Sequence, residues 1–361
     1  MKFLIEDKKY HFKSIFDDKT GAYVRTGVLD ENGNDTGVDP FMASYPHLID
    51  VGIMGHCVHG KTGLCAKAGI GCYQSGLFIQ RPNMSLDDFR NIAEQSRLKC
   101  NQFALGGRGD PDQHEHFEEI LKICRDNFIV PNFTTSGFGM TEHIADLCKE
   151  YCGAVAVSWY RNEYTYRAID MLVSRGVQTY IHYVLGRNSI DEAIDRLKRN
   201  DFPAGIQAVV FLLHKPAGQG SLLNMLDVMD PRVAEFFALI EKPHSFKIGM
   251  DSCNVPGAIN FCKRVKPESL DTCEGARYSC YISSDMVMTP CSFDRDEKYG
   301  VSLRDMSIQD AWESLEFDDF RNRLYTACPG CPKRDLCMGG CPLMPEIVFC
   351  NVPEREAGKE W

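Results

Sequence analysis

Between residues 47 and 213, apolar stretches rich in β-branched and aromatic residues alternate with amphipathic stretches. We expect strands over the apolar stretches 47–55, 100–107, 129–137, 153–159, 177–186 and 208–213. The stretches between them carry apolar residues near positions i, i+3, i+4 and i+7, which predicts helices over 85–98, 114–127, 141–152, 164–176 and 189–200. Strands that alternate with helices in this way pair in parallel through right-handed crossovers. The alternation therefore predicts an α/β fold, a partial (β/α)6 barrel.

Residues at the expected helix ends agree with this period. Ser85 with Asp88, and Ser189 with Glu192, have the spacing of a capping box at a helix start. Gly176 follows a helix end, where a residue in the left-handed conformation is wanted. We therefore expect side-chain caps at Ser85 and Ser189.

The loop after the first expected strand holds three cysteines, Cys57, Cys65 and Cys72, in a glycine-rich stretch. In parallel barrels the loops after the strands form the active site. A structural zinc site usually needs closer cysteine pairs and a fourth ligand, for which His56 or His59 is available. Three thiolates can instead hold an iron–sulfur cluster and leave one iron open. Taken alone, the loop leaves structural zinc and a cluster as open alternatives.

The second expected strand ends in "FALGGRGDP", which puts a glycine turn beside the cysteine loop. This combination resembles the radical S-adenosylmethionine (SAM) enzymes, in which a three-cysteine [4Fe–4S] cluster follows the first strand. In that family a Gly-Gly turn after the second strand binds the amino group of SAM. The spacing here, C-x7-C-x6-C, is longer than the family's usual C-x3-C-x2-C, whereas an aromatic residue after the last cysteine, Tyr73, is common there. The resemblance implies that the turn contacts the cofactor through Gly106, Gly107, Arg108, Gly109 and Asp110.

A dense group of cysteines lies near the C-terminus, with Cys328, Cys331, Cys337 and Cys341 in a C-x2-C-x5-C-x3-C array. From about residue 250 to 352 the chain resembles the SPASM domain, which holds auxiliary clusters in radical SAM peptide-modifying enzymes. The resemblance assigns four cysteines to a first auxiliary [4Fe–4S] cluster: Cys273, Cys280, Cys291 and Cys341. It assigns four to a second: Cys328, Cys331, Cys337 and Cys350. Paired zinc sites are the alternative for such an array.

These features divide the chain into an N-terminal hairpin over 1–45, a barrel over 46–249 and a SPASM domain over 250–361. The hairpin is expected around the turn sequence "DDKTG".

Composition narrows the class of protein further. The formal net charge is −10 and no block of Lys and Arg occurs, so we expect no nucleic-acid partner. We find no export signal and no apolar stretch long enough for a membrane span, which favours a cytoplasmic protein without a membrane partner. The 17 cysteines are then expected to be reduced thiols or metal ligands. The dispersed thiols Cys100, Cys124, Cys148 and Cys152 are expected in the core.

Other polar residues follow the later strands. The family often places a polar residue on SAM after the fourth strand, which points to Ser158, and Asn188 after the fifth strand is a candidate ribose contact. Lys215, after the sixth strand, is a candidate substrate contact. His182 lies inside a strand, where a satisfied core histidine is the plainer interpretation. The alternative for Ser158 is a residue of a solvated loop, and the alternative for Asn188 is a residue that shapes its turn.

The resemblance implies an oxidoreductase that works without oxygen and uses SAM and three [4Fe–4S] clusters. Reductive cleavage of SAM would give a 5′-deoxyadenosyl radical that takes hydrogen from a ribosomal precursor peptide, forming a thioether or C–C crosslink. An electron donor such as flavodoxin or ferredoxin is implied as a partner. Alternatives are side-chain oxidation, as in anaerobic sulfatase maturation, and epimerisation, for which Cys253 is the candidate hydrogen donor. An iron–sulfur electron carrier and a zinc-stapled binding module are the alternatives outside this enzyme class.

Overall fold

The computed structural model describes residues 2–60, 63–266 and 269–350. Seven strands pair in parallel: β4 (Leu48–Met54), β5 (Gln102–Gly107), β6 (Val130–Thr135), β7 (Ala154–Ser158), β8 (Thr179–Leu185), β9 (Ala208–Leu213) and β10 (Lys247–Met250). The first six lie within the predicted ranges, so the alternating pattern is confirmed. The alternation does not predict β10, a four-residue strand that contains Gly249 and carries little pattern of its own.

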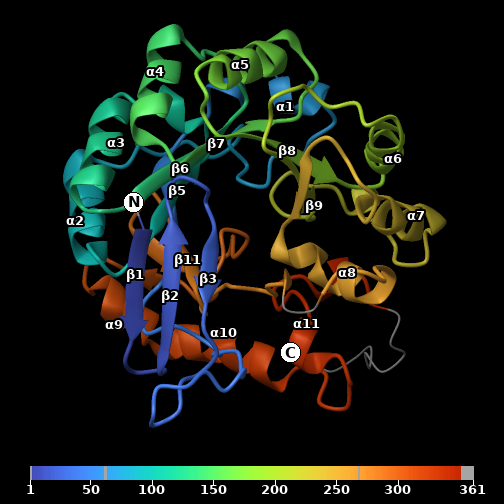
Figure 1. Ribbon diagram of the computed structural model, residues 1–361. Helices are drawn as coiled ribbons and strands as arrows, with labels where there is room; N and C mark the ends of the chain where they lie inside the picture. The colour runs from blue at the N-terminus through green and yellow to red at the C-terminus, as the bar shows by residue number, and fades with distance from the viewer. Residues whose placement is uncertain (1, 61–62, 267–268, 351–361) are drawn as a thin grey trace.

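Helices connect these strands along the outside of the curved sheet (Figure 1). They are α2 (Leu86–Ser96), α3 (Phe117–Asp126), α4 (Glu142–Tyr151), α5 (Glu163–Ser174), α6 (Ile190–Arg199) and α7 (Pro231–Ile240). The first five match the predicted helices. Short segments complete the connections: α1 (Leu64–Lys67) and the 3₁₀ turns η1 (Val58–Gly60), η2 (Pro111–Gln113), η3 (Leu222–Asn224), η4 (Ser252–Asn254) and η6 (Pro345–Ile347).

The predicted helix ends hold in two of three places. The Ser85 side chain accepts a hydrogen bond from the backbone of Asp88, and Gly176 is left-handed with φ of 69°. The cap predicted at Ser189 is wrong, because its hydroxyl donates to the Val184 carbonyl over 2.7 Å and accepts from Gly186 N over 2.9 Å. Ser189 therefore shapes the turn after β8 rather than the start of α6.

The C-terminal segment continues the barrel sheet instead of forming a detached unit. Strand β11 (Ser279–Ile282) pairs in parallel with β4 and sets Cys280 opposite Ile49. β12 (Val287–Thr289) and β13 (Val301–Ser302) follow in antiparallel order, which completes a sheet of ten strands in the order β10-β9-β8-β7-β6-β5-β4-β11-β12-β13. The remaining helices lie below the barrel (Figure 1): α8 (Val255–Phe261), α9 (Ile308–Trp312), α10 (Leu315–Thr326) and α11 (Arg334–Cys337).

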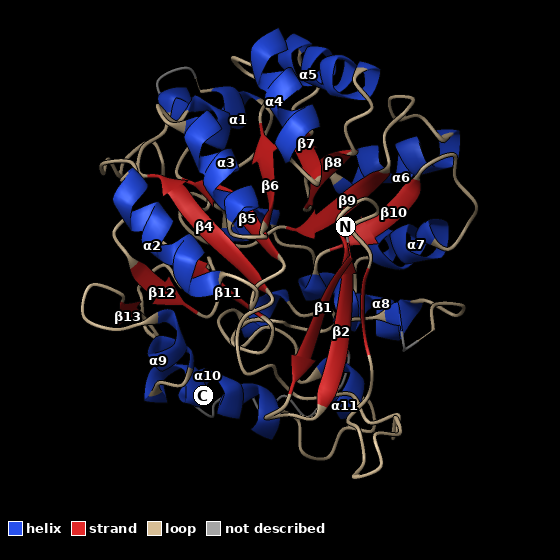
Figure 2. Cartoon of the chain, turned by 60° about the vertical axis from the view of Figure 1, so that its left-hand side comes forward, coloured by secondary structure: helices blue, strands red, loops and turns tan. Residues whose placement is uncertain are grey.

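A separate three-stranded antiparallel sheet lies at the N-terminus (Figure 2). It consists of β1 (Lys2–Asp7), β2 (Phe12–Asp17) and β3 (Tyr23–Arg25). The "DDKTG" turn connects β2 with β3, as predicted for a hairpin, and β1 adds a strand to it.

The hydrophobic core lies between the sheet and the outer helices. On β4, Ile49, Val51 and Ile53 are fully buried on that side. Successive side chains of a strand point to opposite faces, so Asp50 lies on the other face, toward the barrel interior. The predicted core thiols Cys100, Cys124 and Cys148 are buried, and Cys152 is partly buried. Among the described residues no helix has the length and apolarity to cross a membrane.

Candidate cofactor site and cysteine groups

The cysteine loop follows β4 and brings its three thiols near one another. Cys65 lies on the short helix α1, between Cys57 and Cys72 in the chain. Burial raises the pKa of Cys65 to about 11, a hydrogen bond from Tyr160 lowers it, and the nearby Cys72 and Cys57 raise it further. The three thiols therefore lie within electrostatic range of one another.

The predicted glycine turn after β5 lies directly against this loop. A Cβ atom at Gly76 would come within 2.7 Å of the Cys57 Cβ and 2.5 Å of the Arg108 carbonyl oxygen. A Cβ atom at Gly109 would come within 2.6 Å of the His56 carbonyl oxygen. Real Cβ atoms do not tolerate such contacts with backbone, so these glycines permit the close approach of loop and turn.

A buried polar network also ties the loop to the turn. His59 Nε2 lies 2.7 Å from Asp110 Oδ2, and the Ser136 hydroxyl donates to the same oxygen over 2.5 Å. The Ser136 backbone N–H donates to the other carboxylate oxygen over 3.1 Å. Asp110 was expected to contact the cofactor, but both of its oxygens are engaged within the protein. Its role in this structure is to join the cysteine loop, the glycine turn and the end of β6.

Space for a ligand opens beside the turn. A Cβ atom at Gly106 would meet no atom within 4 Å, so the backbone there faces open space. The Arg108 guanidinium is half-buried, and its Nε atom has no hydrogen-bond partner among the described residues. Burial is the main cause that lowers the pKa of Arg108, and Arg295 lowers it further. A thiolate donor set, a close glycine turn and an Arg108 Nε atom without a hydrogen-bond partner among the described residues fit a four-iron cluster with SAM.

Polar residues line the barrel interior near these groups. Ser158 pairs in register with His182 on the next strand, and His182 Nδ1 lies 3.1 Å from the Thr134 hydroxyl. Burial lowers the pKa of His182 to about 4, so the ring is neutral at physiological pH. This agrees with the interpretation of His182 as a histidine whose ring is hydrogen-bonded inside the barrel, rather than a catalytic base.

Asn188 lies near the cysteine loop, but the cavity that it lines is small. Its backbone N–H donates to Asn224 Oδ1 over 2.8 Å, and it lines a cavity of about 40 Å³ together with Ala68, Gly69 and Arg161. A cavity of this size has room for about one water. Contact of Asn188 with the ribose of SAM therefore stays a prediction.

Lys215 is buried in an ion pair instead of facing an open substrate site. Its ammonium group donates to Asp251 Oδ2 over 2.7 Å and to the Leu213 carbonyl over 3.0 Å, and it lies 4.6 Å from the centre of the Phe293 ring. Burial lowers the pKa of Lys215, but the Asp251 carboxylate and the nearby Cys253 raise it above its ordinary value. Lys215 is therefore a fixed cation at the end of β9.

Four cysteines converge beside Lys215. Cys253, in η4, lies close to Cys341, and the interaction with Cys341 together with burial raises the pKa of Cys253. Burial raises the pKa of Cys291, and the nearby Cys273 and Cys253 raise it further. Cys273 is likewise influenced by Cys253. The structure thus brings together Cys253, Cys273, Cys291 and Cys341.

Cys280, expected in this group, lies elsewhere. Because it is opposite Ile49 in the parallel pairing of β11 with β4, it faces the core, where it is 2% exposed. Burial raises its pKa, and the neighbours that raise it further are Cys100 and Asp50. The pairing of two strands far apart in sequence decides this, and cysteine spacing does not reveal it.

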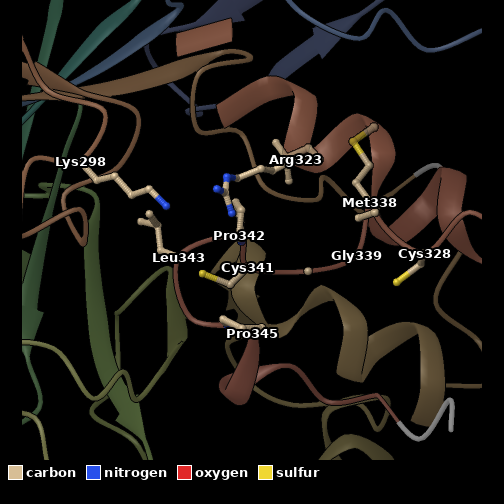
Figure 3. Close-up of a pocket in the computed structure, with 12 residues that line it drawn as sticks. Lys298, Arg323, Cys328, Met338, Gly339, Cys341, Pro342, Leu343 and Pro345 are labelled. Atoms are coloured by element: carbon tan, nitrogen blue, oxygen red, sulfur yellow. The ribbon is translucent and has the colours of Figure 1, made fainter. Parts of the chain in front are cut away.

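Cys328, the first cysteine of the remaining array, lines a cavity of about 240 Å³ (Figure 3). The stretch from Met338 to Pro342 runs along it, and both Cys328 and Cys341 line it. Gly339 and Gly340 have positive φ, and a Cβ atom at Gly339 would lie 2.3 Å from the Ala327 Cβ. This turn separates Cys341, which belongs to the group beside Lys215, from the cysteines expected in the second group. Among the described residues no three His, Cys, Asp or Glu side chains are placed to hold a single metal ion.

A model of the SPASM iron–sulfur cluster-binding domain matches residues 273–332. The chain carries a SPASM domain. The match begins at Cys273, so Cys253 lies outside it, and only its place in space associates it with this group. No curated protein sequence matches the chain.

Solved structures share the fold over most of the chain. The structure of Streptococcus suis SuiB bound to S-adenosylmethionine has a TM-score of 0.64 at 15% identity and covers 86% of this chain and 78% of SuiB. SuiB bound to precursor peptide SuiA has a TM-score of 0.68 at 12% identity, with 97% and 99% covered. Native anSMEcpe with bound AdoMet and Cp18Cys peptide has a TM-score of 0.60 at 17% identity, with 84% and 91% covered. The chain shares the parallel-stranded α/β fold of these proteins, as predicted, and the SPASM match lies near its C-terminus.

Proposed function

We propose that this protein is a radical SAM enzyme that modifies a ribosomal precursor peptide. The observation that carries the proposal is the packing of a three-cysteine loop against a glycine turn, at the carboxyl ends of β4 and β5, in a fold shared with SAM-bound proteins. The carboxyl ends of parallel barrel strands are where active sites of such folds lie.

Cys57, Cys65 and Cys72 would hold a [4Fe–4S] cluster with one iron open to the amino and carboxylate groups of SAM. When bound, the cluster and SAM supply the electron and the 5′-deoxyadenosyl radical that removes hydrogen from an unreactive C–H bond. The backbone at Gly106 faces the open space where the amino group would lie. The Arg108 Nε atom, which has no hydrogen-bond partner among the described residues, is the proposed donor to the carboxylate.

The chain's own residues keep this site in one geometry. The network of His59, Asp110 and Ser136 fixes the loop relative to the turn. Ser158, at the end of β7, and Asn188, in the turn after β8, are kept as proposed SAM contacts. A site held this way is already ordered before substrate and cofactor bind, so it loses little conformational entropy when they do.

For the auxiliary clusters we propose a ligand set that differs from the one expected from spacing. Cys253, Cys273, Cys291 and Cys341 would hold the first, because they converge in space, and Cys280 would remain a core thiol. Cys328, Cys331, Cys337 and Cys350 would hold the second. Four protein thiolates close a cluster to substrate and suit it to electron transfer. With Cys253 as a ligand, epimerisation loses its candidate hydrogen donor.

A peptide substrate is favoured by the folds that the chain resembles, since SuiB binds a precursor peptide and anSMEcpe binds the Cp18Cys peptide. We propose a thioether or C–C crosslink as the product, with flavodoxin or ferredoxin as electron donor. Either crosslink removes two hydrogen atoms from the peptide, which mass spectrometry of a candidate precursor detects. Side-chain oxidation, the alternative, would leave a carbonyl product in its place.

The test is metal analysis of the full chain purified and reconstituted without oxygen. Three four-iron clusters require about twelve irons and twelve sulfides per chain. Zinc in place of iron, in a colourless protein, would replace the enzyme proposal with the zinc-stapled binding module.

A further inference from the structure

The cysteine loop needs support from outside itself. It places seven residues between Cys57 and Cys65 and six between Cys65 and Cys72. Cys65 lies on α1, a helix of four residues in which no residue is buried. A helix this short has little stability of its own, so its position depends on contacts with neighbouring segments.

One such contact comes from the segment that follows β7. The Tyr160 hydroxyl donates a hydrogen bond to Cys65 Sγ over 3.3 Å. The Tyr160 backbone N–H donates to the Ser158 carbonyl over 2.8 Å, which turns the chain sharply at the strand end.

The next residue, Arg161, holds the other end of α1. Its guanidinium donates to the carbonyl of Ala68, the residue that ends the helix. The last carbonyls of a helix lack partners within it, so this bond satisfies one of them. Arg161 is left-handed with φ of 59°, a conformation that a residue other than glycine adopts only when its surroundings impose it.

Helix α6 anchors this segment through one carboxylate. Glu192 accepts from the Arg161 guanidinium over 2.5 Å and from Trp159 Nε1 over 3.2 Å. Arg196, one turn further along the same helix, donates to Glu192 over 2.8 Å and completes its environment. Arg161 thus connects α6 to the cysteine loop, because its guanidinium bonds both Glu192 and the Ala68 carbonyl.

We infer that Tyr160 and Arg161 clamp the middle of the long cysteine loop to the barrel, and that the Tyr160 hydroxyl tunes the cluster on that loop through the Cys65 sulfur. This inference rests on the proposed function, since it assumes that Cys57, Cys65 and Cys72 hold the cluster. Hydrogen bonds to the sulfurs help to set the reduction potential of such a cluster. A donor at sulfur stabilises the added negative charge of the reduced cluster, so Tyr160 raises its potential. Tyr160 is a positioning residue that acts through Cys65.

The first test compares Tyr160→Phe with Tyr166→Phe in the full chain, reconstituted without oxygen. Tyr166 packs on Trp159 with its ring and is 41% exposed, so its variant loses a hydroxyl from the same region without touching the loop. The measurement is a redox titration followed by electron paramagnetic resonance. The SAM-binding cluster is identified as the one whose reduced signal changes when SAM is added. We expect a more negative midpoint potential in Tyr160→Phe, with unchanged iron content, and a wild-type midpoint in Tyr166→Phe.

A wild-type midpoint in Tyr160→Phe, with a normal SAM-responsive signal, would overturn the inference and leave the proposed function intact. Absence of any SAM-responsive signal in the wild-type chain would overturn both. The clamp is tested separately by the rate at which a chelator removes iron from that cluster. We expect faster loss in Arg161→Gln than in Arg167→Gln, whose guanidinium bonds the Met140 carbonyl instead. Equal rates in these two variants and the wild type would contradict the clamp.

Discussion

The Lys215 ammonium and the Asp251 carboxylate form a buried ion pair over 2.7 Å, directly beside the cysteines that converge at the end of β9. The pair places a fixed positive charge next to the proposed first auxiliary cluster. We predict that Lys215→Gln makes the midpoint potential of that cluster more negative, because reduction adds negative charge that the cation stabilises. A redox titration that finds the wild-type midpoint in this variant would contradict this role.

The same substitution tests the pair's part in stability. Lys215→Gln leaves the Asp251 carboxylate without its partner, and breaking a buried pair from one side costs about 3 kcal/mol. Chemical denaturation should show this loss. The double variant Lys215→Gln with Asp251→Asn should recover part of it, since no charge is then left unpaired.

We predict that Cys253, and not Cys280, is a ligand of the first auxiliary cluster. Cys253→Ala should lower the iron content by up to about four atoms per chain, because a cluster with an incomplete thiolate set is readily lost. Cys280→Ala should keep all of its iron, since Cys280 faces the core. Iron and sulfide assays of the two variants after identical reconstitution decide the question. The reverse pattern would restore the assignment from cysteine spacing.

Two glycines of the cofactor site should respond differently to alanine. Gly76→Ala forces a Cβ against the Cys57 side chain and the Arg108 carbonyl, so we expect it to displace the loop and lose the SAM-binding cluster. Gly106→Ala has room for its Cβ, so we expect it to keep its iron. Its methyl group points into the space proposed for SAM and should weaken SAM binding about tenfold, or about 1.4 kcal/mol. Equilibrium binding of SAM to the iron-loaded variants measures this. Unchanged affinity in Gly106→Ala would mean that SAM does not bind against the glycine turn.

His47 gives the fold a predictable dependence on pH. It is 4% exposed where the N-terminal sheet meets β4, and Tyr23 Oη lies 2.8 Å from its Nδ1. Burial lowers the pKa of His47 to about 4, so the folded chain holds it neutral while the unfolded chain takes up a proton near pH 6.5. Its stabilising contribution is therefore complete above pH 6.5 and declines as the pH falls toward 4.

Between pH 7.5 and pH 5.5 we expect the free energy of unfolding to fall by about 1 kcal/mol through this group alone. Urea denaturation at the two pH values measures the change. His47→Gln cannot take up the proton and should show a smaller fall by about that amount. An equal fall in both proteins would mean that other groups cause the pH dependence.

The regular part of the fold can be predicted from the sequence because its signals are local. The period of apolar residues located β4 to β9 and α2 to α6, and Ser85 and Gly176 marked helix ends correctly. The features that were missed depend on contacts between distant segments. The hydroxyl of Ser189 found a carbonyl on β8 instead of the helix start, and β10 owes its place to pairing with β9.

The same division holds at the candidate site. The glycine turn beside the cysteine loop follows from strand order alone, since neighbouring parallel strands end at the same edge. The sequence does not place Cys253 in the ligand set of the first auxiliary cluster, because no short spacing links it to Cys341. It does place Cys280 there, because spacing does not show which face of β11 Cys280 occupies. Tyr160 carries no signal beyond its position after a strand, so its bond to Cys65 becomes visible only in the folded chain.

The central claim is that the Cys57, Cys65 and Cys72 loop enables this protein to cleave SAM. The measurement is the release of 5′-deoxyadenosine when the anaerobically reconstituted full chain receives dithionite and SAM. The account predicts release by the wild-type chain and none by the variant with Cys57→Ala, Cys65→Ala and Cys72→Ala, which should keep the iron of its auxiliary clusters. No nucleoside from an iron-loaded wild-type chain, or equal amounts from both proteins, would contradict it.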